Sequence, residues 1–168
     1  MVRDDPLRPR TSGATGRRLE SIVHTYVSPA WLPSGGIAEV VRGGQPQPPM
    51  AMVRLLVRRE GSVFCVPRED SGSLDLPTRR LGRLDGDGTD IARLLASEIT
   101  LADASVEYVG CVRNIVFQPD KDYGWPVPVA RFGVWSTHEP PRIPGVWIAT
   151  GEDSPLVTRH WYPLLSGA

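Results

Sequence analysis

The residues of this sequence best suited to chemistry lie in the segment 74–101, LDLPTRRLGRLDGDGTDIARLLASEITL. Its first residues are typical of the end of a β-strand, and a loop rich in Arg, Gly and Asp follows them. The spacing of the apolar residues then predicts one amphipathic helix. Unpaired backbone N–H groups and the helix dipole favour anions where a loop enters a helix. The segment is therefore a candidate site for chemistry on phosphates.

The expected helix has two sectors, because residues three and four positions apart lie side by side. One sector is apolar and wide enough to pack on a sheet; it consists of Ile91, Ala92, Leu95, Ala96, Ile99 and Ala102. The adjoining sector should face outward and consists of Asp90, Leu94, Ser97, Glu98 and Leu101.

At this point the chain resembles the Nudix hydrolase family. The Nudix box reads Gly, five residues, Glu, seven residues, then Arg-Glu-U-x-Glu-Glu-x-Gly-U, where U is aliphatic, and its first glycine usually ends Leu-Pro-Gly-Gly. Laid without a gap on residues 76–79, the box places Asp85 at its first acid, Arg93 at its arginine and Glu98 at the second Glu of the pair. The spacing of the box is therefore intact.

Several letters of the box that carry its chemistry are replaced. The substitutes are Thr78 and Arg79 for the two glycines, Leu94 for the Glu after the arginine, Ser97 for the first Glu of the pair, and Thr100 for the last glycine. In the family the helix glutamates hold divalent metal on the pyrophosphate and help to activate water. The resemblance therefore implies a catalytic and metal-binding role for Glu98 alone, with Asp85 as a shortened second acid.

The small number of remaining carboxylates limits how well this segment could bind Mg²⁺. Mg²⁺ takes about six oxygens in near-octahedral order, and protein carboxylates must offset its reluctant dehydration. One Glu beside a Leu and a Ser makes an incomplete site, although substrate phosphates or Asp90 could add ligands. We therefore expect Mg²⁺ to bind weakly, if at all. Apart from the resemblance, Glu98 is interpreted as a solvated helix carboxylate that pairs with Arg93 or another cation.

Three further residues are candidates for contact with a ligand. Arg68 follows an apolar run, where many Nudix members carry a basic residue that contacts phosphate; alternatively, it is one of several exposed loop charges. Arg79 opens the loop before the helix and is the second candidate. Trp125 lies in the loop 118–128, and loops of this length often carry ligand contacts. It could stack on a base or simply cap the core.

The composition indicates one soluble, globular domain. The chain has 168 residues, of which 40% are hydrophobic and 23% charged, so it can bury a real core. Lys and Arg number 19, as do Asp and Glu, and a formal net charge of zero implies no bulk attraction to nucleic acid or to an anionic membrane. No apolar run approaches the roughly 18 residues that span a bilayer, and no signal core opens the sequence. We therefore expect a cytoplasmic protein.

The cysteines and histidines predict neither a metal site nor a disulfide framework. Cys65 and Cys111 each lie in an apolar, strand-like run, where Cys usually acts as a small buried hydrophobe. His24, His138 and His160 stand apart from one another in the sequence. His160 lies beside Trp161 and Tyr162, so we expect it to be packed or exposed rather than a metal ligand.

The pattern of the remaining sequence predicts the elements that position these candidates. Residues 1–15 should be a mobile arm, 17–27 a short helix and 37–42 a short strand, with a Gly- and Pro-rich linker at 43–49. Trp31 and Leu32, between two prolines, should lie as a plug on the main domain. The runs 50–58 and 63–66 predict a β-hairpin, and 106–117, 129–136 and 146–149 predict further strands. Ser154 should cap a final helix that ends at residue 165.

Together these expectations describe an α/β protein, a Nudix-type α/β/α sandwich with a mixed β-sheet at 50–168, preceded by the flexible arm 1–15 and by an extension and linker at 16–49. Two functions remain open. The first is a catalytically silent Nudix-like domain that binds a nucleotide-like or diphosphate ligand, or a protein partner; the loss of two helix glutamates favours it. The second is a divergent Mg²⁺-dependent pyrophosphohydrolase acting on a nucleoside diphosphate derivative. The expected partner is a small molecule rather than a nucleic-acid polymer or a membrane, and a homodimer stays open.

Overall fold

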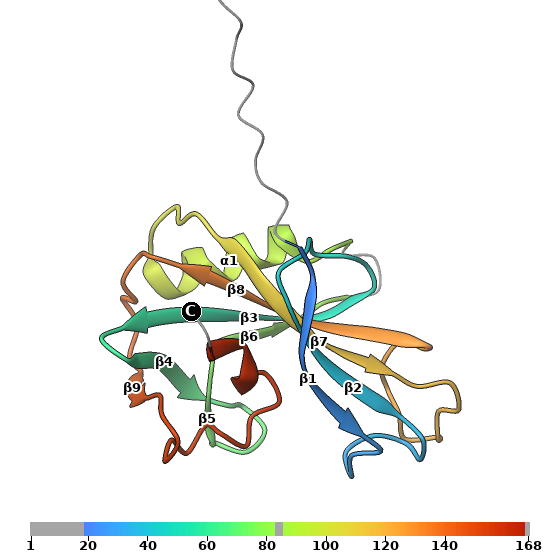
Figure 1. Cartoon of the computed structure of the whole chain (residues 1–168). Coiled ribbons are helices and arrows are strands. Elements are labelled where there is room, and N and C mark those ends of the chain that lie inside the picture. The colour runs from blue at the N-terminus through green and yellow to red at the C-terminus, as the bar shows by residue number, and fades with distance from the viewer. Residues whose placement is uncertain (1–18, 83–85, 167–168) are drawn as a thin grey trace, which may run out of the picture.

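The computed structural model describes residues 19–82 and 86–166 (Figure 1). In this part of the chain nine strands form one sheet in the order β1-β2-β7-β8-β3-β4-β5, with β6 on β3 and β9 on β4. The strands are β1 (Ser21–Val27), β2 (Ile37–Arg42), β3 (Met50–Arg59), β4 (Ser62–Pro67), β5 (Leu74–Asp75), β6 (Thr78–Arg80), β7 (Glu107–Ile115), β8 (Val129–Thr137) and β9 (Val146–Ala149). The helices are α1 (Thr89–Thr100) and the 3₁₀ helix η1 (Tyr162–Leu165). The pair β3–β8 is parallel and the other strand pairs are antiparallel, so the sheet is mixed.

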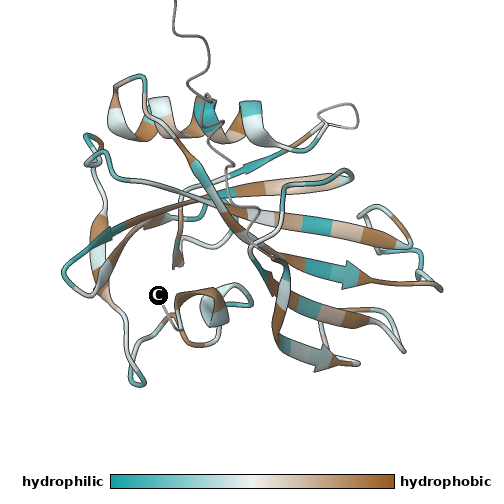
Figure 2. Ribbon diagram, turned by 45° about the horizontal axis from the view of Figure 1, so that its top comes forward, coloured by the Kyte–Doolittle hydropathy of each residue, from teal (hydrophilic) through white to brown (hydrophobic). Residues whose placement is uncertain are grey.

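Two hydrophobic clusters cover the two faces of the sheet. On one face α1 packs on the central strands; this cluster includes Ala92, Leu95, Ala96 and Ile99 of the helix with Val53, Leu55 and Trp135 of the sheet. On the other face lie the C-terminal turns and η1; this cluster includes Leu156, Trp161 and Leu164 with Val40, Val112 and Phe132. Figure 2 shows α1 on one side of the sheet and η1 on the other. An α/β fold with a mixed sheet between two outer layers is therefore confirmed.

The helix α1 follows its sequence pattern closely. Ala92, Leu95, Ala96 and Ile99 are buried, as the apolar sector predicts, while Leu94 and Glu98 are exposed. Of the other two residues of that sector, Ile91 is half-buried, and Ala102 lies beyond the end of the helix and is exposed. The side chain of Asp87 accepts a hydrogen bond from the Thr89 N–H (2.9 Å) and so satisfies one free donor of the first turn. The helix ends where Leu101 turns into the left-handed region at φ 54°.

The helix expected at 17–27 is wrong, because residues 21–27 form β1 and pair with β2. The pairing skips from Ile22 to His24, so Val23 forms a bulge. Val23 and Tyr26 both pack against the core cluster, although residues three apart on a regular strand point to opposite faces. The bulge thus produces the three-residue spacing that, in the sequence, is typical of a helix.

The α-helix expected from Ser154 to residue 165 is also wrong, because this segment consists of turns followed by η1. Ser154 does accept a hydrogen bond from the N–H of Leu156 (3.3 Å). The backbone bonds that follow join residues three apart, among them Arg159 to Leu156 and Leu164 to Trp161. This i→i+3 pattern belongs to turns and 3₁₀ helices, and it buries Leu156 and Trp161 on the sheet without a continuous helix.

The other predicted strands are confirmed, and the predicted plug is present. β3 and β4 form the expected hairpin, and β2, β7, β8 and β9 lie where they were predicted. Leu32 is buried in the core, and the half-exposed Trp31 packs on His160. Cys65 and Cys111 are free and buried, as expected of small hydrophobes. The predicted arm 1–15 lies outside the described residues.

The N-terminal extension is an integral part of the sheet. β2 pairs with β7 along its whole length, from Ile37 opposite Ile115 to Arg42 opposite Gly110. The division of the chain at residue 49 stays a prediction, and β1 and β2 are continuous with the later strands. Neither helix in the described ranges has the length and hydrophobicity that a membrane span requires.

Candidate functional site

The carboxylate singled out by the sequence, Glu98, is bound to a cation within the protein. The Nη2 of Arg79 donates hydrogen bonds to both Oε1 and Oε2 of Glu98, at 2.6 Å each. The side chains of both residues remain partly exposed. Arg93, the other cation considered for Glu98, pairs instead with Asp90 at 3.1 Å. The interpretation of Glu98 as a helix carboxylate paired with a cation fits this geometry, with Arg79 as the cation.

The described residues around Glu98 do not fit a magnesium ion. Leu94 and Ser97 offer no carboxylate, and the Ser97 hydroxyl donates to the backbone carbonyl of Arg93 (3.1 Å). Across the ranges 19–82 and 86–166, no three His, Cys, Asp or Glu side chains form a group that could hold a metal. Asp85, the second predicted metal ligand, lies outside the described residues. The guanidinium of Arg79 takes the contacts that a cation would make with Glu98.

The alternation of side chains along β6 separates two regions of the protein. Arg79 projects toward α1, whereas the guanidinium of Arg80 lies over the ring of Trp125, 4.4 Å from its centroid. Trp125 packs against the cluster on the opposite face from α1. The side chains of Arg79 and Arg80 therefore lie on opposite faces of the sheet.

A cleft of about 340 Å³ lies on the face of the sheet to which the Arg80 side chain points. Its floor is formed by neighbouring strands: Met52 of β3 pairs with Phe132 of β8, and Phe132 pairs with Val112 of β7. Arg80 pairs with Met52 from the other side. Arg54 follows two positions after Met52 in β3 and so projects to the same face. All five side chains line the cleft.

Arg54 is the cation lining this cleft whose buried atoms lack hydrogen-bond partners. Its Nε and Nη1 atoms are buried and have no hydrogen-bond partner in the described part of the chain. The pKa of Arg54 is lowered to about 10, chiefly because burial disfavours the charged form, and the nearby cations Arg68 and Arg159 contribute to the lowering. Asp75 acts in the opposite direction. Arg54 is thus a partly buried cation at neutral pH, and two of its nitrogen atoms have no partner among the described residues.

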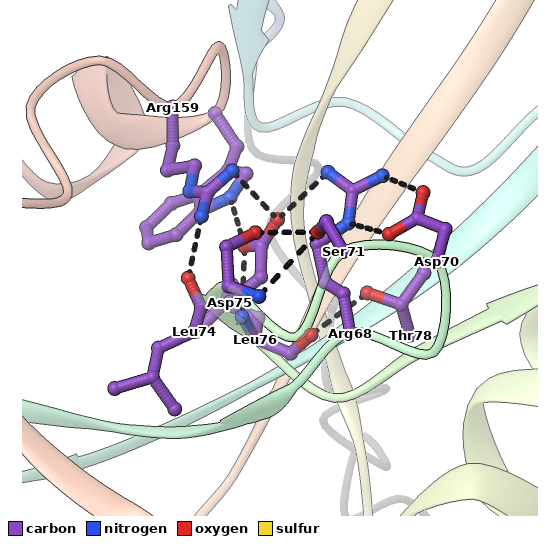
Figure 3. A network of polar contacts seen from close by, with 10 residues as sticks. Arg68, Asp70, Ser71, Leu74, Asp75, Leu76, Thr78 and Arg159 are labelled. Carbon is purple, nitrogen blue, oxygen red and sulfur yellow. Dashed lines mark hydrogen bonds and ion pairs between the residues drawn. The ribbon is translucent and has the colours of Figure 1, made fainter.

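Asp75 is the carboxylate at this end of the cleft, and it is only 4% exposed. Its Oδ1 accepts hydrogen bonds from the Trp161 indole N–H (2.9 Å) and from the Leu76 backbone N–H (2.8 Å). Its Oδ2 lies 3.8 Å from Nη1 of Arg68 and 3.8 Å from Nη1 of Arg159 (Figure 3). This one buried carboxylate is therefore already shared by Arg68 and Arg159, so it cannot fully balance the charge of Arg54.

Arg68 and Arg159 make further polar contacts, none of which involves Arg54. Arg68 forms a double hydrogen bond with Asp70, from Nε to Oδ1 at 3.1 Å and from Nη2 to Oδ2 at 2.7 Å, and this bond raises the pKa of Arg68. Nη2 of Arg159 donates to the carbonyl of Leu74 (2.6 Å). This end of the cleft consequently carries an excess of positive charge.

Aromatic rings form the sides of the cleft. Trp125 meets Phe132 edge to face, with ring centroids 5.0 Å apart. Trp31, from the loop between β1 and β2, stacks on His160 with centroids 3.7 Å apart and an angle of 16° between the rings. Burial lowers the pKa of His160, and the charges of Arg54 and Arg159 lower it further. His160 is therefore a neutral, flat ring at pH 7, packed against an aromatic residue as the sequence suggested.

The far end of the floor has a different polar character. Asn114 pairs with Ala130 of β8, and its Oδ1 is buried without a hydrogen-bond partner among the described residues. The Tyr123 hydroxyl is also buried and lies beside the Asn114 side chain, but the contact falls outside hydrogen-bonding geometry. Asp122, which precedes Tyr123 in the loop, is exposed at the mouth. This end therefore presents an amide oxygen, which accepts, and a hydroxyl, which can donate or accept.

The structure thus divides the predicted site residues into two groups. Arg68 and Trp125 line the cleft, while Arg79 and Glu98 form an ion pair on the other face. Sequence reasoning missed Arg54 as a functional residue. The available signal was its position within the apolar run MAMVRLLV, because a charge inside a buried strand must be paired or must serve a function.

Comparison with known proteins leaves the family open. No family model matches the sequence, and no curated protein matches it. Among solved structures, the chain is similar to a mutant of the Bacillus subtilis pyrophosphohydrolase BsRppH, at 16% sequence identity and a TM-score of 0.49, over 77% of this chain and 80% of that chain. The α/β architecture with a mixed sheet is observed, and membership of the Nudix family stays a prediction.

Proposed function

We propose that this protein binds a small anionic ligand with a planar ring, nucleotide-like or diphosphate-bearing, in the Arg54 cleft, without divalent-metal hydrolysis. The observation that carries the proposal is Arg54 itself. A guanidinium whose Nε and Nη1 are buried and unpaired has lost its hydration and gained no partner. A phosphate or carboxylate that accepts from this guanidinium would neutralise its charge and give it a partner.

The charges near Arg54 support an anion rather than a neutral ligand. Arg54, Arg68 and Arg159 lie near the buried carboxylate of Asp75, and Asp70 neutralises only Arg68. Electrostatic attraction is strong at such a site, because the low-dielectric surroundings screen charges poorly. A bound anion would complete the charge balance at this end of the cleft.

The aromatic sides of the cleft support a ligand with a ring. Trp125 and the Trp31–His160 stack line the same cavity as Arg54. Planar rings stack favourably on such surfaces with little sequence or substituent preference. A volume of about 340 Å³ lies in the lower part of the range for small-molecule pockets, about 300–1,000 Å³. The ligand should therefore be no larger than a mononucleotide or a compact diphosphate ester.

The arrangement at Glu98 argues against metal-dependent hydrolysis. Both oxygens of Glu98 are engaged by Arg79, and β6 separates this pair from the cleft that holds Arg54. A ligand whose anionic group contacts Arg54 would lie on the opposite face of the sheet from Glu98. We therefore assign no step of a reaction to this carboxylate.

Isothermal titration of the full chain with nucleoside monophosphates, nucleoside diphosphates, sugar nucleotides and pyrophosphate, in Mg²⁺ and in EDTA, tests the proposal. We expect at least one compound to bind with equal affinity in both media. Arg54→Gln should weaken that binding at least about tenfold, because a charge-assisted double hydrogen bond is lost. Arg142→Gln, an exposed arginine between β8 and β9 on the α1 side, should bind as wild type.

Two results would overturn the proposal. The first is the absence of binding across the whole panel in both media. The second is Mg²⁺-dependent release of phosphate or of a mononucleotide that Glu98→Gln reduces a thousandfold, since this would establish the hydrolase instead.

A further inference from the structure

We infer that the part of the α1 face that extends beyond the helix is a self-association surface, on which a second copy of this chain packs face to face. The centre of this surface is a row of apolar side chains, one from each of four neighbouring strands, and it consists of Val27, Ile37, Ile115 and Val129. The row and the Arg54 cleft lie on opposite faces of the sheet, so the inference does not rest on the proposed function.

Strand pairing places the four side chains of this row side by side. Val27 of β1 pairs with Ile37 of β2, and Ile37 pairs with Ile115 of β7. Ile115 in turn pairs with Val129 of β8. Paired residues point to the same face of a sheet. Trp135, six positions after Val129 in β8, packs in the cluster that contains α1, so the row belongs to the α1 face.

The row remains exposed to solvent in the described part of the chain. The strands β1, β2 and β7 extend away from α1 (Figure 1). Ala38 and Ala130, which point to the opposite face, are fully buried at 0% exposure. Their neighbours Ile37 and Val129 are only half-buried, and Val27 is 75% exposed. The same strands are therefore covered on the cleft face and open on the α1 face.

Two more apolar side chains extend the row into a patch. Phe117 lies two positions beyond the row in β7 and is 79% exposed, and Val127 lies two positions ahead of the row's residue in β8 and is 49% exposed. The N–H of Val116 still pairs with the carbonyl of Pro128 (2.8 Å), so the alternation of β7 continues and places Phe117 on the open face. A contiguous exposed apolar patch is typical of an interaction surface.

The composition of residues 1–18 argues against that segment as the occupant. Three of its residues are Met, Val or Leu, whereas five are Arg and two are Asp. The segment also joins the sheet at the Ser21 end of β1, and Val27 lies about 20 Å further along the strand, at about 3.3 Å per residue. It therefore brings little apolar surface, and it starts from the wrong end of β1.

The charges beside the patch fit a second copy. Glu39 and Arg113 form the next row of the open face, where they pair at 2.7 Å, with Thr25 on one side and Arg131 on the other. Glu20 also pairs with Arg113, at 2.9 Å. A two-fold axis that runs along the strands, between β2 and β7, reverses the strand order and keeps each row in register. Glu39 then lies over Arg113 of the partner subunit, so the charges meet with opposite sign.

The same axis packs the apolar rows on each other. Ile37 lies over Ile115 of the partner subunit, and Val27 lies over Val129 of the partner subunit. Strands about 4.8 Å apart and residues about 3.3 Å apart give the surface sides of about 20 Å. Two such surfaces bury on the order of 1,000 Å² in total, near the lower limit for a specific interface, so the dimer should be weak.

Sedimentation equilibrium of the full chain, from about 1 to about 500 µM, tests the surface. We expect reversible dimerisation with a dissociation constant on the order of 10 µM. Val27→Lys should weaken it at least about tenfold, because a charge would be buried against an apolar row. Leu94→Lys is the matched control at an exposed apolar position of α1 and should dimerise as wild type.

Substitutions of Thr25 test the two-fold arrangement. Thr25 is exposed and pairs with Glu39, so it belongs to the charged row and lies over Arg131 of the partner subunit. Thr25→Glu should tighten the dimer about threefold and Thr25→Lys should weaken it about threefold, as expected for one partly screened charge pair. Both differences should shrink in 1 M salt.

Three results would overturn the inference. The first is a wild-type chain that stays monomeric up to about 500 µM, and the second is an unchanged dissociation constant in Val27→Lys. The third is an equal effect of Thr25→Glu and Thr25→Lys, which would exclude the two-fold arrangement. Val27→Lys should bind ligands in the cleft as wild type does. The absence of any ligand would overturn the proposed function and leave this inference standing.

Discussion

Arg79 and Arg80 are adjacent in β6 but act on opposite faces of the sheet. Arg79 closes an ion pair with Glu98 of α1 at 2.6 Å, and Arg80 lies 4.4 Å from the ring centre of Trp125 in the cleft. The two-residue period of a strand requires this separation. The segment that the sequence treats as one site is therefore two regions, one between β6 and the helix and one in the cleft.

Replacing Arg54 by Met should stabilise the unliganded protein and remove anion binding. Met fills similar space without a charge that must be desolvated, so we expect the free energy of unfolding to rise by about 1–3 kcal/mol. Urea unfolding measures the stability and titration calorimetry the binding. Arg142→Met, at an exposed position, should change stability by less than about 0.5 kcal/mol. A marked loss of stability in Arg54→Met would contradict the assignment of Arg54 as an unsatisfied cation.

The Arg79–Glu98 pair should contribute little to stability. Both side chains are more than a third exposed, at 37% and 44%, so solvent and salt screen their attraction. A double-mutant cycle with Arg79→Ala and Glu98→Gln should give a coupling free energy of about 0.5–1 kcal/mol that shrinks in 1 M salt. Ligand affinity should be unaffected in both single mutants. A tenfold change in affinity on either substitution would connect this pair to the cleft and contradict their separation.

The stability of the protein should fall on acidification partly through His160. Burial and the charges of Arg54 and Arg159 lower the pKa of His160 below its ordinary value of 6.5 in the folded state, and Asp75 offsets this only in part. Below about pH 6.5 the unfolded chain therefore takes up a proton that the folded chain does not, and stability is lost until the pH reaches the folded pKa. Urea unfolding between pH 7 and pH 5 should show a smaller loss in His160→Gln than in wild type. Equal losses would show that His160 titrates normally.

Gly110 should tolerate no side chain. It has φ +156° at the irregularity in the pairing of β7 with β8, and a Cβ there would lie 2.1 Å from the carbonyl oxygen of Val41. Because backbone cannot move aside as a flexible side chain can, Gly110→Ala should cost about 2–4 kcal/mol in thermal or urea unfolding. Gly124→Ala, where a Cβ meets nothing within 4 Å, is the matched control and should be nearly neutral. Similar stabilities of the two variants would show that β2 and β7 can separate without cost.

Much of the fold could be predicted from local patterns. The hairpin of β3 and β4, the helix α1 and the strands β7, β8 and β9 follow from apolar periodicity and turn residues that lie close together in the sequence. The strand β1 could not be predicted in this way, because its bulge at Val23 gives the apolar residues a helical spacing. The C-terminal turns could not be predicted either, since their burial depends on contacts of Leu156 and Trp161 with strands far away in the sequence.

The candidate site was predictable only in part. The resemblance to the Nudix box drew attention to Glu98, and the structure shows which cation that carboxylate contacts. Arg68 and Trp125 were identified, but the cleft that joins them depends on the pairing of β3, β7 and β8. Arg54 and Asn114 come together on one floor through that pairing alone. Sequence spacing cannot show it, because parallel pairing of β3 with β8 joins distant segments.

The stack of Trp31 on His160 determines when, during synthesis, the protein becomes able to bind a ligand in the cleft. Trp31 leaves the ribosome before most of the sheet, whereas His160 follows all nine strands. A nascent chain can pair every strand and still have an open cleft until His160 has emerged and docked. Ligand capture should accordingly begin only after the sheet is assembled, so the ligand would stabilise chains in which His160 has already docked.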